Sequence, residues 1–424
     1  MVRKIKLKTS KQKIAIVGTG ISSLTSAYIL SRKHDVHLFE KNDYIGGHTH
    51  THTIVENDKV FNVDSGFIVY NENTYPNFIS LLNQLNVDSQ HTTMGFSVKS
   101  KLNDFEYAGN SLNSFFAQRK NIFKPSFIKM STDILRFNRL SLKEIENIDE
   151  KLSLIDYLKN YKFSNIFISH YIIPMGAAIW STSPKSMLNM PASFFIRFFK
   201  NHGLLQVTNR PQWWVIKNGS KQYVKELIKP FKNNIRLNSK VKSVERINGK
   251  VRLSFNSDEE EFDSIVIGTH SDQALKILKN PSQDELSILS KIKYQKNVAI
   301  IHTDESILPK RKLAWSCWNY LINKNQDELV TLTYNMNMLQ TLDAERTYCV
   351  TLNNTHDIDK NKIIKEIIYH HPLFTEDSVF AQTQKSSICG KDNTYFCGSY
   401  WGYGFHEDGV NSALDVCKKF GLSL

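Results

Sequence analysis

Residues 13–40 read KIAIVGTGISSLTSAYILSRKHDVHLFE, and this stretch decides the fold. Its apolar pattern predicts a buried strand over 13–17, an amphipathic helix from Ile21 to about Ser31, and a second strand over 35–39. A strand, a helix and a strand in this order are typical of a parallel βαβ unit. The sequence therefore predicts an α/β fold.

The turn after the first strand has the spacing of a dinucleotide-binding fingerprint. Gly18 supplies the tight turn, and Gly20 lets the backbone approach a pyrophosphate at the helix N-terminus. Glu40 ends the second strand twenty residues after Gly20, where a carboxylate accepts hydrogen bonds from the adenosine ribose. Ser23 replaces the third glycine, whose position mainly allows close helix–strand packing, and serine is small. An ordinary strand–helix turn is the alternative interpretation.

The residues after Glu40 favour FAD over NAD. Gly46 and Gly47 would let a further segment pass close to the cofactor phosphates. The sequence has no second glycine fingerprint after a strand, because the Gly402-Tyr403-Gly404 stretch lacks both a third small residue and a following ribose acid. We therefore expect one bound dinucleotide, FAD.

The composition is that of a globular protein. Of the 424 residues, 41% are hydrophobic and 22% are charged, and no apolar run reaches the roughly 18 residues that cross a bilayer. The basic start precedes an apolar run too short for a signal peptide. The five cysteines form no CxxC pair, which is typical of a reducing compartment. We expect the protein in the cytoplasm.

The formal net charge is +13. A basic excess attracts nucleic acid, anionic lipid surfaces or acidic substrates. Zinc-finger spacing, RNP-like aromatic motifs and heptads behind a basic region are all missing from the sequence, so nucleic acid is not expected as a partner. A lysine-rich, solvated surface accounts for part of the excess, and the oligomeric state is not predictable.

Seven strings in the sequence are distinctive: GGH at 46–48, DSGFIVYN at 64–71, PMGAAIWS at 174–181, HGLL at 202–205, PQW at 211–213, AWSCWNY at 314–320 and GFHEDG at 404–409. Through them the chain resembles the flavin-containing amine oxidase superfamily, which includes monoamine oxidases, protoporphyrinogen oxidase and phytoene-desaturase-like enzymes. Within the superfamily, the chain is most similar to a bacterial NAD/FAD-binding branch. That branch resembles desaturases that act on methyl-branched fatty acyl chains toward furan fatty acids.

The resemblance implies a Rossmann-like FAD-binding domain of the glutathione-reductase type, discontinuous in sequence, and an α+β substrate domain with a mostly helical insertion. The FAD-binding domain is expected over 1–80, 212–275 and 386–424, and the substrate domain over 81–211 and 276–385. In the second insertion we expect strands at 298–302, 329–334 and 348–352 and a helix over 360–369, which would end before Pro372.

The resemblance also assigns contacts to the cofactor. Val241 would make a backbone contact to the adenine, residues 262–269 would form the strand that closes the flavin sheet, and 395–399 would end a strand beside the ribityl chain. Ser399 replaces the acid that is usual there. The helix that opens at Gly409 and Val410 would direct its dipole at the flavin N1/O2 edge, where negative charge develops on reduction.

The full set of expected cofactor contacts combines the fingerprint with the resemblance. It comprises Gly18, Gly20, Ile21, Ser22, Ser23, Glu40, Lys41, Gly46, Gly47, His48, Asp64, Gly66, Phe67, Val241, Gly268, Thr269, Gly398, Ser399, Phe405, His406, Asp408, Gly409 and Val410.

His406 is the candidate catalytic residue. In monoamine oxidases the matching position carries an aromatic residue of the amine cage, whereas here a histidine precedes two acids. It could act as a general base, since the ordinary pKa of histidine lies near the working pH. It could equally be a core histidine that is hydrogen-bonded to a backbone carbonyl.

His48, His50 and His52 alternate with threonines. On a strand they would share one face, as metal ligands can. No acid or cysteine joins them locally, so a polar strand near the pyrophosphate is favoured and no metal is expected.

Residues 113–140 hold six basic residues against one acid, interleaved with five phenylalanines. Such a segment could form a helical cap over the flavin. It could also lie on an anionic membrane at the inner face of the cytoplasmic membrane, with its aromatic side chains down and its cations toward the headgroups.

We therefore expect a flavin dehydrogenase or oxidase that removes a hydride from a C–H bond of an apolar lipid, in the sharpest form a methylated fatty acyl chain of a phospholipid. Electrons would pass to oxygen, a quinone or a carrier. One alternative is oxidation of a primary amine or polyamine. Another is a flavoprotein that only assists a lipid-modifying enzyme.

Overall fold

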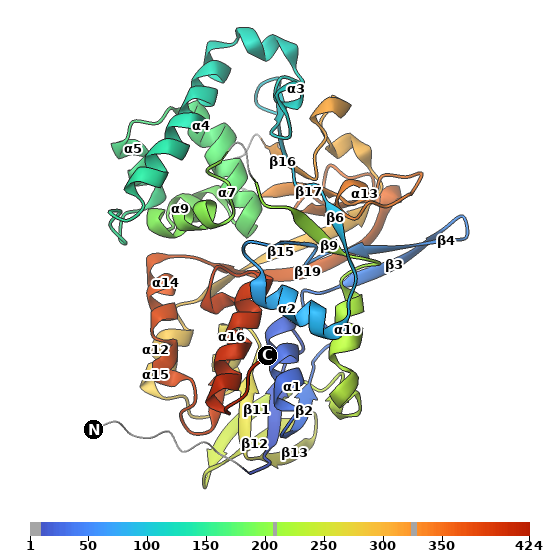
Figure 1. Cartoon of the computed structure of the whole chain (residues 1–424), viewed down its shortest axis with the longest axis vertical. Helices are drawn as coiled ribbons and strands as arrows, with labels where there is room; N and C mark the ends of the chain where they lie inside the picture. Colours follow the sequence, from blue (N-terminus) through green and yellow to red (C-terminus); the bar gives the residue numbers. More distant parts are fainter. Residues whose placement is uncertain (1–9, 207–209, 324–328) are drawn as a thin grey trace.

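The computed structural model describes residues 10–206, 210–323 and 329–424. Figure 1 shows three tiers along the long axis of the molecule. The N-terminal strands with α1 and α16 lie at the bottom, a large sheet crosses the middle, and the helices labelled α4, α5, α7 and α9 lie at the top.

The bottom tier is built on a five-stranded sheet in which all neighbours are parallel. Its order is β10 (Ile235–Arg236), β2 (Asp35–Phe39), β1 (Lys13–Val17), β14 (Ser264–Ile267) and β20 (Thr394–Phe396). The predicted strands over 13–17 and 35–39 are confirmed. The strand within 262–269 does not close the sheet, because β20 lies beyond it at the edge.

Two helices cover this sheet side by side, α1 (Ile21–Leu30) and α16 (His406–Lys419). A Cβ on Gly409 would lie 2.7 Å from Ile21 Cγ2, so a glycine lets the two helices approach. A Cβ on Gly268 would lie 2.0 Å from Ser23 Oγ. The close packing expected at the third fingerprint position is therefore present, with the glycine on the strand side.

The final helix begins earlier than predicted. It starts at His406, not at Gly409 or Val410, because Phe405 N donates to Asp408 Oδ2 at 2.9 Å and this bond caps the helix one turn upstream. Gly409 therefore lies inside the first turn. The absence of a side chain at this position allows α16 to pack closely against α1, and the residue does not begin the helix.

The middle tier is a seven-stranded sheet. Its order is β19 (Ile363–Leu373), β15 (Lys293–His302), β18 (Cys349–Leu352), β17 (Thr331–Asn335), β16 (Trp318–Ile322), β7 (Phe96–Ser100) and β8 (Phe105–Ala108). Only β16 and β7 run parallel. The strands predicted at 298–302, 329–334 and 348–352 are confirmed.

The helix predicted over 360–369 is wrong. Most of this stretch belongs to strand β19, which pairs with β15 from Lys293↔Leu373 to His302↔Ile363. Pro372 lies inside the strand and does not follow a helix. It is tolerated because β19 is the edge strand, where one side of the backbone needs no ladder partner.

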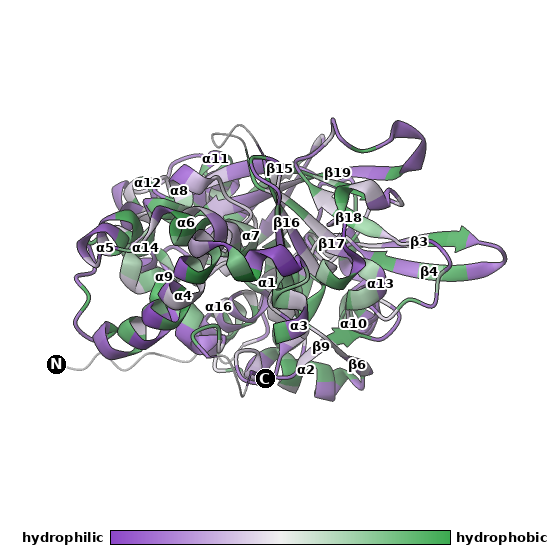
Figure 2. Ribbon diagram, turned by 90° about the horizontal axis from the view of Figure 1, so that it is seen from above, coloured by the Kyte–Doolittle hydropathy of each residue, from purple (hydrophilic) through white to green (hydrophobic). Residues whose placement is uncertain are grey.

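The remaining strands form three smaller sheets. One contains β11 (Val241–Ile247), β12 (Lys250–Phe255) and β13 (Asp258–Phe262), and another β5 (Val69–Asn71), β9 (Trp213–Ile216) and β6 (Ser89–Thr92). The third is the hairpin of β3 (Thr51–Glu56) and β4 (Lys59–Asp64), which projects from the body (Figures 1 and 2).

The top tier holds short helices and one long one. They are α3 (Leu112–Phe115), η1 (Arg119–Phe123), α4 (Pro125–Glu144), α5 (Leu154–Asn160), α6 (Asn165–Phe167), α7 (Ile173–Trp180), α8 (Pro184–Leu188) and α9 (Ala192–Asn201). The helical insertion expected within 81–211 is confirmed. A core rich in phenylalanine joins these helices to the middle sheet.

Further helices surround the two large sheets. They are α2 (Pro76–Leu85), α10 (Lys221–Leu227), α11 (Ser271–Ile277), α12 (Gln283–Leu289), α13 (Met336–Leu339), α14 (Glu376–Thr383) and α15 (Lys385–Ile388). In the three described ranges, no helix combines the length and the apolar character needed to cross a membrane.

The two large sheets draw on different parts of the chain. The five-stranded sheet uses strands from 1–80, 212–275 and 386–424, and the seven-stranded sheet uses strands from 81–211 and 276–385. The sheet of β5, β9 and β6 mixes the two sets. The domain boundaries themselves stay predictions.

Candidate active site

A cavity of about 2070 Å³ runs from the carboxyl edge of the bottom sheet to the helices of the top tier. A single ligand site usually measures roughly 300–1,000 Å³. The cavity therefore has room for a large cofactor and for a second molecule beside it.

The lower end of the cavity has the form of an anion site. Helix α1 begins at Ile21 without a side-chain cap and without an acid in its first turn. Its free amide groups and its positive dipole end therefore face the cavity at Gly20. A Cβ on Gly20 would meet no atom within 4 Å. This open space lies where a pyrophosphate would approach the backbone.

The paired glycines lie directly against this turn. Gly47 has φ +59°, and a Cβ there would come within 3.1 Å of Gly20 Cα. Gly46 has φ +128°, and a Cβ there would lie 2.3 Å from the carbonyl oxygen of Thr49. Both positions therefore require glycine, and the segment passes the α1 N-terminus as expected.

Glu40 is held firmly at the end of β2. One carboxylate oxygen accepts hydrogen bonds from Thr19 N at 3.0 Å and from Thr19 Oγ1 at 2.6 Å. The other accepts from Asn42 N at 2.9 Å. Glu40 lines the cavity but is only 5% exposed. Its remaining lone pairs suit the two hydroxyl groups of a ribose.

Most of the residues expected to contact the cofactor line this cavity. They are Gly18, Gly20, Ile21, Ser22, Glu40, Lys41, Gly46, Gly47, His48, Gly66, Phe67, Val241, Gly268, Thr269, Gly398, Ser399, Phe405 and His406. Five others, Ser23, Asp64, Asp408, Gly409 and Val410, lie behind the cavity wall. Contact with the cofactor stays a prediction for every one of them.

Asp64 has a clear structural task. The carboxylate is fully buried and accepts bonds from Ser220 N at 3.0 and 3.1 Å and from Gln340 Nε2 at 2.9 Å. Burial raises the pKa of Asp64 to about 6. Since Ser220 precedes α10, Asp64 ties the β4 strand to the start of that helix. A direct bond from Asp64 to the cofactor would need one of these partners to move.

The two acids that follow His406 also cap helices. Asp408 accepts the bond that starts α16, and burial raises its pKa to about 6. Glu407 accepts bonds from Asn77 N at 2.9 Å and from Phe78 N at 2.8 Å, in the first turn of α2. The sequence offered no signal for this cap, because α2 lies some 330 residues earlier in the chain.

His406 lies at the N-terminus of α16 and lines the cavity. Its Nε2 is 2.8 Å from the Tyr223 hydroxyl and 3.2 Å from Thr49 Oγ1, and its ring stacks on Phe67 with centroids 3.5 Å apart. Burial lowers the pKa of His406 well below its usual value. These contacts favour a neutral, hydrogen-bonded core histidine over a general base, although the partner is a side chain and not a carbonyl.

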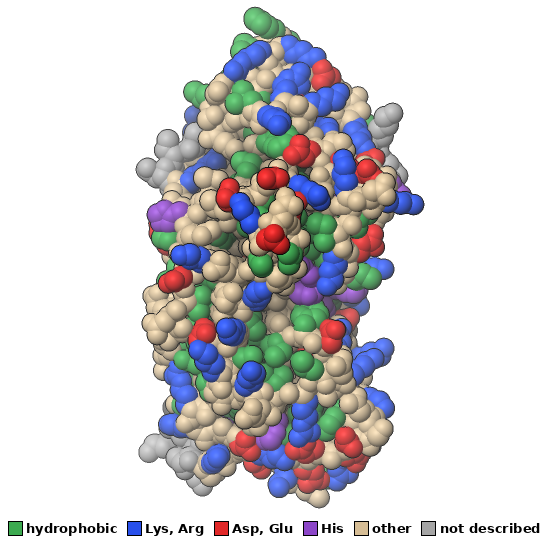
Figure 3. Space-filling model, turned by 90° about the vertical axis from the view of Figure 1, so that its right-hand side faces the viewer, with side chains coloured by type: hydrophobic (Ala, Val, Ile, Leu, Met, Phe, Trp, Pro, Cys, Tyr) green, Lys and Arg blue, Asp and Glu red, His purple; other side chains and the backbone are tan. Residues whose placement is uncertain are grey.

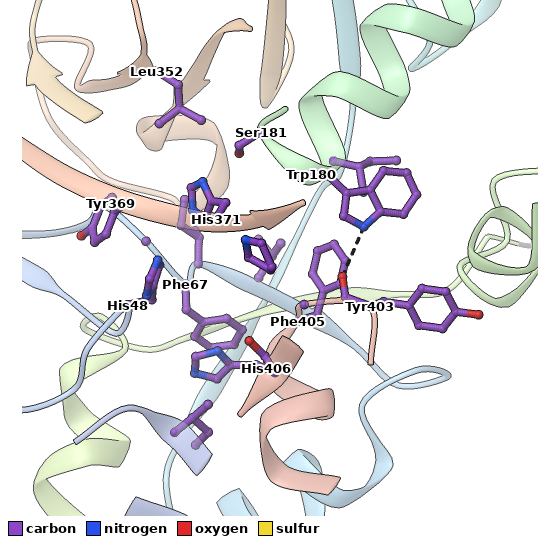
Figure 4. A pocket seen from close by; sticks show the side chains of 18 of the residues that line it. His48, Phe67, Trp180, Ser181, Leu352, Tyr369, His371, Tyr403, Phe405 and His406 are labelled. Carbon is purple, nitrogen blue, oxygen red and sulfur yellow. Dashed lines mark hydrogen bonds between the residues drawn. The ribbon is translucent and has the colours of Figure 1, made fainter. Parts of the chain in front are cut away.

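A group of histidines lines one side of the cavity, and Figure 4 shows His48, Tyr369 and His371 there. The His48 ring lies 4.9 Å from Tyr369 and 5.4 Å from His371 between centroids. Burial lowers the pKa of His48 to about 4 and that of His371 to about 3. His48 Nε2 is buried and has no hydrogen-bond partner within the described chain. It is therefore free to bond a molecule in the cavity.

The predicted row of His48, His50 and His52 does not form. Only His52 lies on β3, where its Nε2 is 2.9 Å from Ser65 Oγ. His50 precedes the strand and stacks on Tyr44. Residues 10–206, 210–323 and 329–424 contain no cluster of three His, Cys, Asp or Glu side chains that could hold a metal ion.

The upper end of the cavity is aromatic and aliphatic. Trp180 Nε1 donates to the carbonyl oxygen of Tyr403 at 3.2 Å, which joins α7 to the loop before α16 (Figure 4). Phe198 stacks on Phe405 with centroids 5.1 Å apart. The other apolar lining residues are Phe96, Tyr107, Leu112, Phe115, Phe116, Ile134, Leu135, Tyr171, Met175, Ile179, Leu204, Trp213, Trp318, Tyr334, Met338, Leu352, Ile368 and Phe374.

Charge on the cavity wall is unequal. Of the described residues that line it, Glu40 alone carries a carboxylate. The cationic lining residues are Lys41, Arg210, Lys240, Lys242 and Lys276. The site therefore suits an anionic cofactor and a neutral or anionic second molecule.

The residues present fit FAD. The open space at Gly20 and the uncapped start of α1 would hold the pyrophosphate, and Glu40 would hold the ribose. Val241 lines the same cavity, and its expected contact with the adenine stays a prediction. The unpartnered His48 Nε2 offers a polar contact farther along the cavity.

Sequence reasoning missed several lining residues. His371 lines the cavity from β19, as do His370 and Tyr369. Tyr223, which bonds His406, was also missed. The false helix over 360–369 hid the first three, whereas Tyr223 lies on a helix far from His406 in sequence.

The sequence profile of the flavin-containing amine oxidoreductase family matches residues 21–352. No curated protein has a significant sequence match to the chain.

Solved structures with the same fold extend over nearly the whole chain. A CLA-producing fatty acid isomerase from P. acnes has a TM-score of 0.68 and 14% identity, and the match covers 96% of this chain and 98% of that one. Cyclohexylamine oxidase from Brevibacterium oxydans IH-35A has a TM-score of 0.70 and 12% identity, with 97% and 100% covered. A variant of putrescine oxidase has a TM-score of 0.69 and 14% identity, with 97% and 99% covered. The mixed α/β fold with a Rossmann-like FAD-binding part is thus confirmed.

Proposed function

The chain belongs to the family of flavin-containing amine oxidoreductases, and we propose that this FAD-dependent oxidoreductase takes a hydride from a C–H bond of an apolar lipid. In the sharpest form of the proposal, the substrate is a methylated fatty acyl chain of a phospholipid. FAD, when bound, supplies the hydride acceptor. The protein positions the chain and keeps water out.

The observation that carries the proposal is the character of the cavity beyond the nucleotide end. Its wall there consists of aromatic and aliphatic side chains such as Trp180, Phe198 and Phe405. An acyl chain would bury its surface against them, with a gain of about 0.8 kcal/mol for each buried CH₂.

Two further points support a fatty acyl substrate. A fatty acid isomerase shares this fold over nearly its whole length. The string over 404–409 and the others quoted above resemble the branch related to methyl-branched acyl desaturases. The proposal that the acyl chain is methyl-branched rests on that resemblance alone.

Oxidation of a primary amine or polyamine is the second candidate, and it is favoured by the family description and by neighbours such as putrescine oxidase. A cationic amine is held by a carboxylate or by aromatic faces, and the upper wall of the cavity offers aromatic faces. Among the described lining residues, however, Glu40 is the lone carboxylate; it is bonded by Thr19 and Asn42 and is the expected partner of the ribose. The cationic lining residues also repel an amine. We therefore rank this candidate lower. A purely assisting flavoprotein is set aside because the family consists of oxidoreductases.

An anaerobic titration of the FAD-loaded protein tests the proposal. We expect phospholipids with methyl-branched acyl chains to bleach the flavin absorbance, and unbranched phospholipids of equal chain length to do so more slowly. Putrescine and cyclohexylamine are titrated in the same way to test the amine candidate. Bleaching by amines alone would replace the proposal with the second candidate, and equal bleaching by both lipids would remove the methyl branch from it.

A further inference from the structure

An exposed apolar surface lies on the outside of the top tier, and we call its four side chains, Leu112, Phe123, Ile128 and Leu135, the apolar ridge. Phe123 is 85% exposed, Leu112 80%, Leu135 60% and Ile128 52%. Single exposed apolar residues are ordinary on a protein surface. Four that come from one continuous segment, α3–η1–α4, are a candidate contact surface.

The ridge is separate from the side of α4 that packs into the core. Helix α4 buries Phe127, Met130 and Phe137 on its inner side. Ile128 and Leu135 are seven residues apart, so they lie above one another on the outer side. Helix α4 is therefore apolar on both sides, and only the inner side has a partner within the described chain.

Cations border the ridge. Arg119 donates to the carbonyl oxygen of Phe116 at 2.9 Å, and Lys124 donates to that of Asp104 at 2.9 Å, so neither of these bonds neutralises the charge. Asp133, the single acid of α4 before its last turn, is 1% exposed and is paired with Lys129. Figure 3 shows apolar side chains at the top of the molecule among Lys and Arg side chains, with few acids.

The ridge is continuous with the cavity. Leu112 and Leu135 belong to the ridge and also line the cavity, together with Phe115 and Ile134 beneath them. The ridge and the cavity therefore share apolar side chains, although Ser111 and Ser131 also line the cavity beside them.

We propose that the α3–η1–α4 segment docks the protein on an anionic phospholipid bilayer. The four side chains of the ridge enter the boundary between headgroups and acyl chains, and Arg119 and Lys124 contact the phosphate groups. The cavity then opens toward the bilayer between Leu112 and Leu135. Passage of an acyl chain through this opening rests on the proposed function, whereas the docking itself does not.

Charge distinguishes a bilayer from a second protein as the occupant. A self-complementary protein interface around the ridge would bring the Arg119 and Lys124 of two copies together, and the segment holds no exposed acid between 112 and 143 to offset them. An anionic bilayer offers negative charge at every position around the ridge.

Sedimentation with vesicles tests the docking. We expect the FAD-loaded protein to bind vesicles of phosphatidylglycerol and phosphatidylcholine at low salt, and phosphatidylcholine vesicles at least tenfold more weakly. The double variant Phe123→Ser/Ile128→Ser, whose positions do not line the cavity, should bind the anionic vesicles about tenfold more weakly or worse. The matched control Val55→Ser/Phe380→Ser removes side chains that are 69% and 65% exposed elsewhere, and it should bind like the unchanged protein.

A second double variant tests the contribution of the two cations to vesicle binding. Arg119→Gln/Lys124→Gln should lower the affinity for the anionic vesicles by about fivefold for each charge removed. Lys250→Gln/Lys418→Gln, which removes two exposed charges from β12 and α16 in the bottom tier, should leave the affinity unchanged.

Failure of the docking and failure of the proposed function are distinguishable. Wild-type protein that does not bind anionic vesicles, or ridge variants that bind as tightly as the control, would overturn the docking. So would a dimer in sedimentation velocity that only the ridge variants abolish. Flavin reduction by detergent-dispersed phospholipid would still test the function, and it should be equal in the ridge variants and the control.

Discussion

No atom of the described chain lies where a side chain of residue 20 would be, so a substitution at Gly20 tests the pyrophosphate site directly. Its φ of −68° is accessible to alanine, and a Cβ there meets no atom within 4 Å. We expect Gly20→Ala to fold with unchanged stability but to lose about 1–3 kcal/mol of FAD binding free energy, because the methyl group fills the space of the pyrophosphate.

Fluorescence titration of the apoprotein with FAD measures this loss, and thermal unfolding of the apoprotein provides the control. An alanine variant with normal affinity for FAD would show that the pyrophosphate does not approach Gly20.

His406 gives the second test at this scale. Its Nε2 is engaged by Tyr223, and its lowered pKa keeps it neutral. We expect His406→Gln, which can retain a bond to Tyr223, to change the rate of flavin reduction by less than about tenfold, below the 10²–10⁴-fold that a general base contributes. Stopped-flow reduction by the lipid substrate measures the rate. A hundredfold loss with normal FAD content would establish His406 as the base.

Single residues also show what sequence could and could not predict about the site. Gly18, Gly20 and Glu40 were predictable because their roles depend on neighbours within one βαβ unit. Asp64 and Glu407 were not, because each bonds the backbone of a helix from another part of the chain. A motif shows that an acid is present but does not show which helix it caps.

At the scale of elements, the contact between α1 and α16 depends on Gly409. A Cβ there would lie 2.7 Å from Ile21 Cγ2. We expect Gly409→Ala to lower the free energy of unfolding by about 1–3 kcal/mol, since overpacking costs more than the better helix propensity of alanine returns.

Chemical denaturation of the apoprotein measures this change. Lys418→Ala, on the exposed side of α16, is the matched control and should have little effect. Equal stability of Gly409→Ala and the control would mean that the two helices move apart without cost.

The β19 strand shows where element prediction fails. Ile363, Ile364, Ile367 and Ile368 repeat at spacings of three and four, which is a helical pattern. In the structure, β19 gains a full antiparallel ladder with β15, and β-branched residues suit a strand. Tertiary pairing therefore overrides the periodicity, and the error hid the lining residues that β19 contributes to the cavity.

At the scale of the whole molecule, buried histidines predict a dependence of stability on pH. Burial lowers the pKa of His34, His48, His50, His52, His170, His202, His270, His302, His371 and His406. Below pH 6.5 the unfolded chain takes up protons that the folded chain does not. Stability therefore falls as the pH falls, by at most about 1.4 kcal/mol per pH unit for each histidine.

Three acids act in the opposite direction, because burial raises the pKa values of Asp64 and Asp408 to about 6 and raises that of Glu407. Three acids only partly offset ten histidines. We expect the melting temperature of the FAD-loaded protein to fall steadily from pH 7 to pH 5, as followed by circular dichroism with flavin fluorescence recorded in parallel. A melting temperature that stays level or rises over this range would contradict the buried, neutral state of these side chains.

The proposed function requires that the cavity hold FAD at its glycine-lined end and leave its aromatic end free for an apolar substrate. The most direct measurement is the stoichiometry of FAD in the purified protein, by absorbance and by titration of the apoprotein. We predict one FAD per chain, released on unfolding. A folded, colourless protein that takes up no FAD when it is offered would contradict the assignment of the cavity as an FAD site.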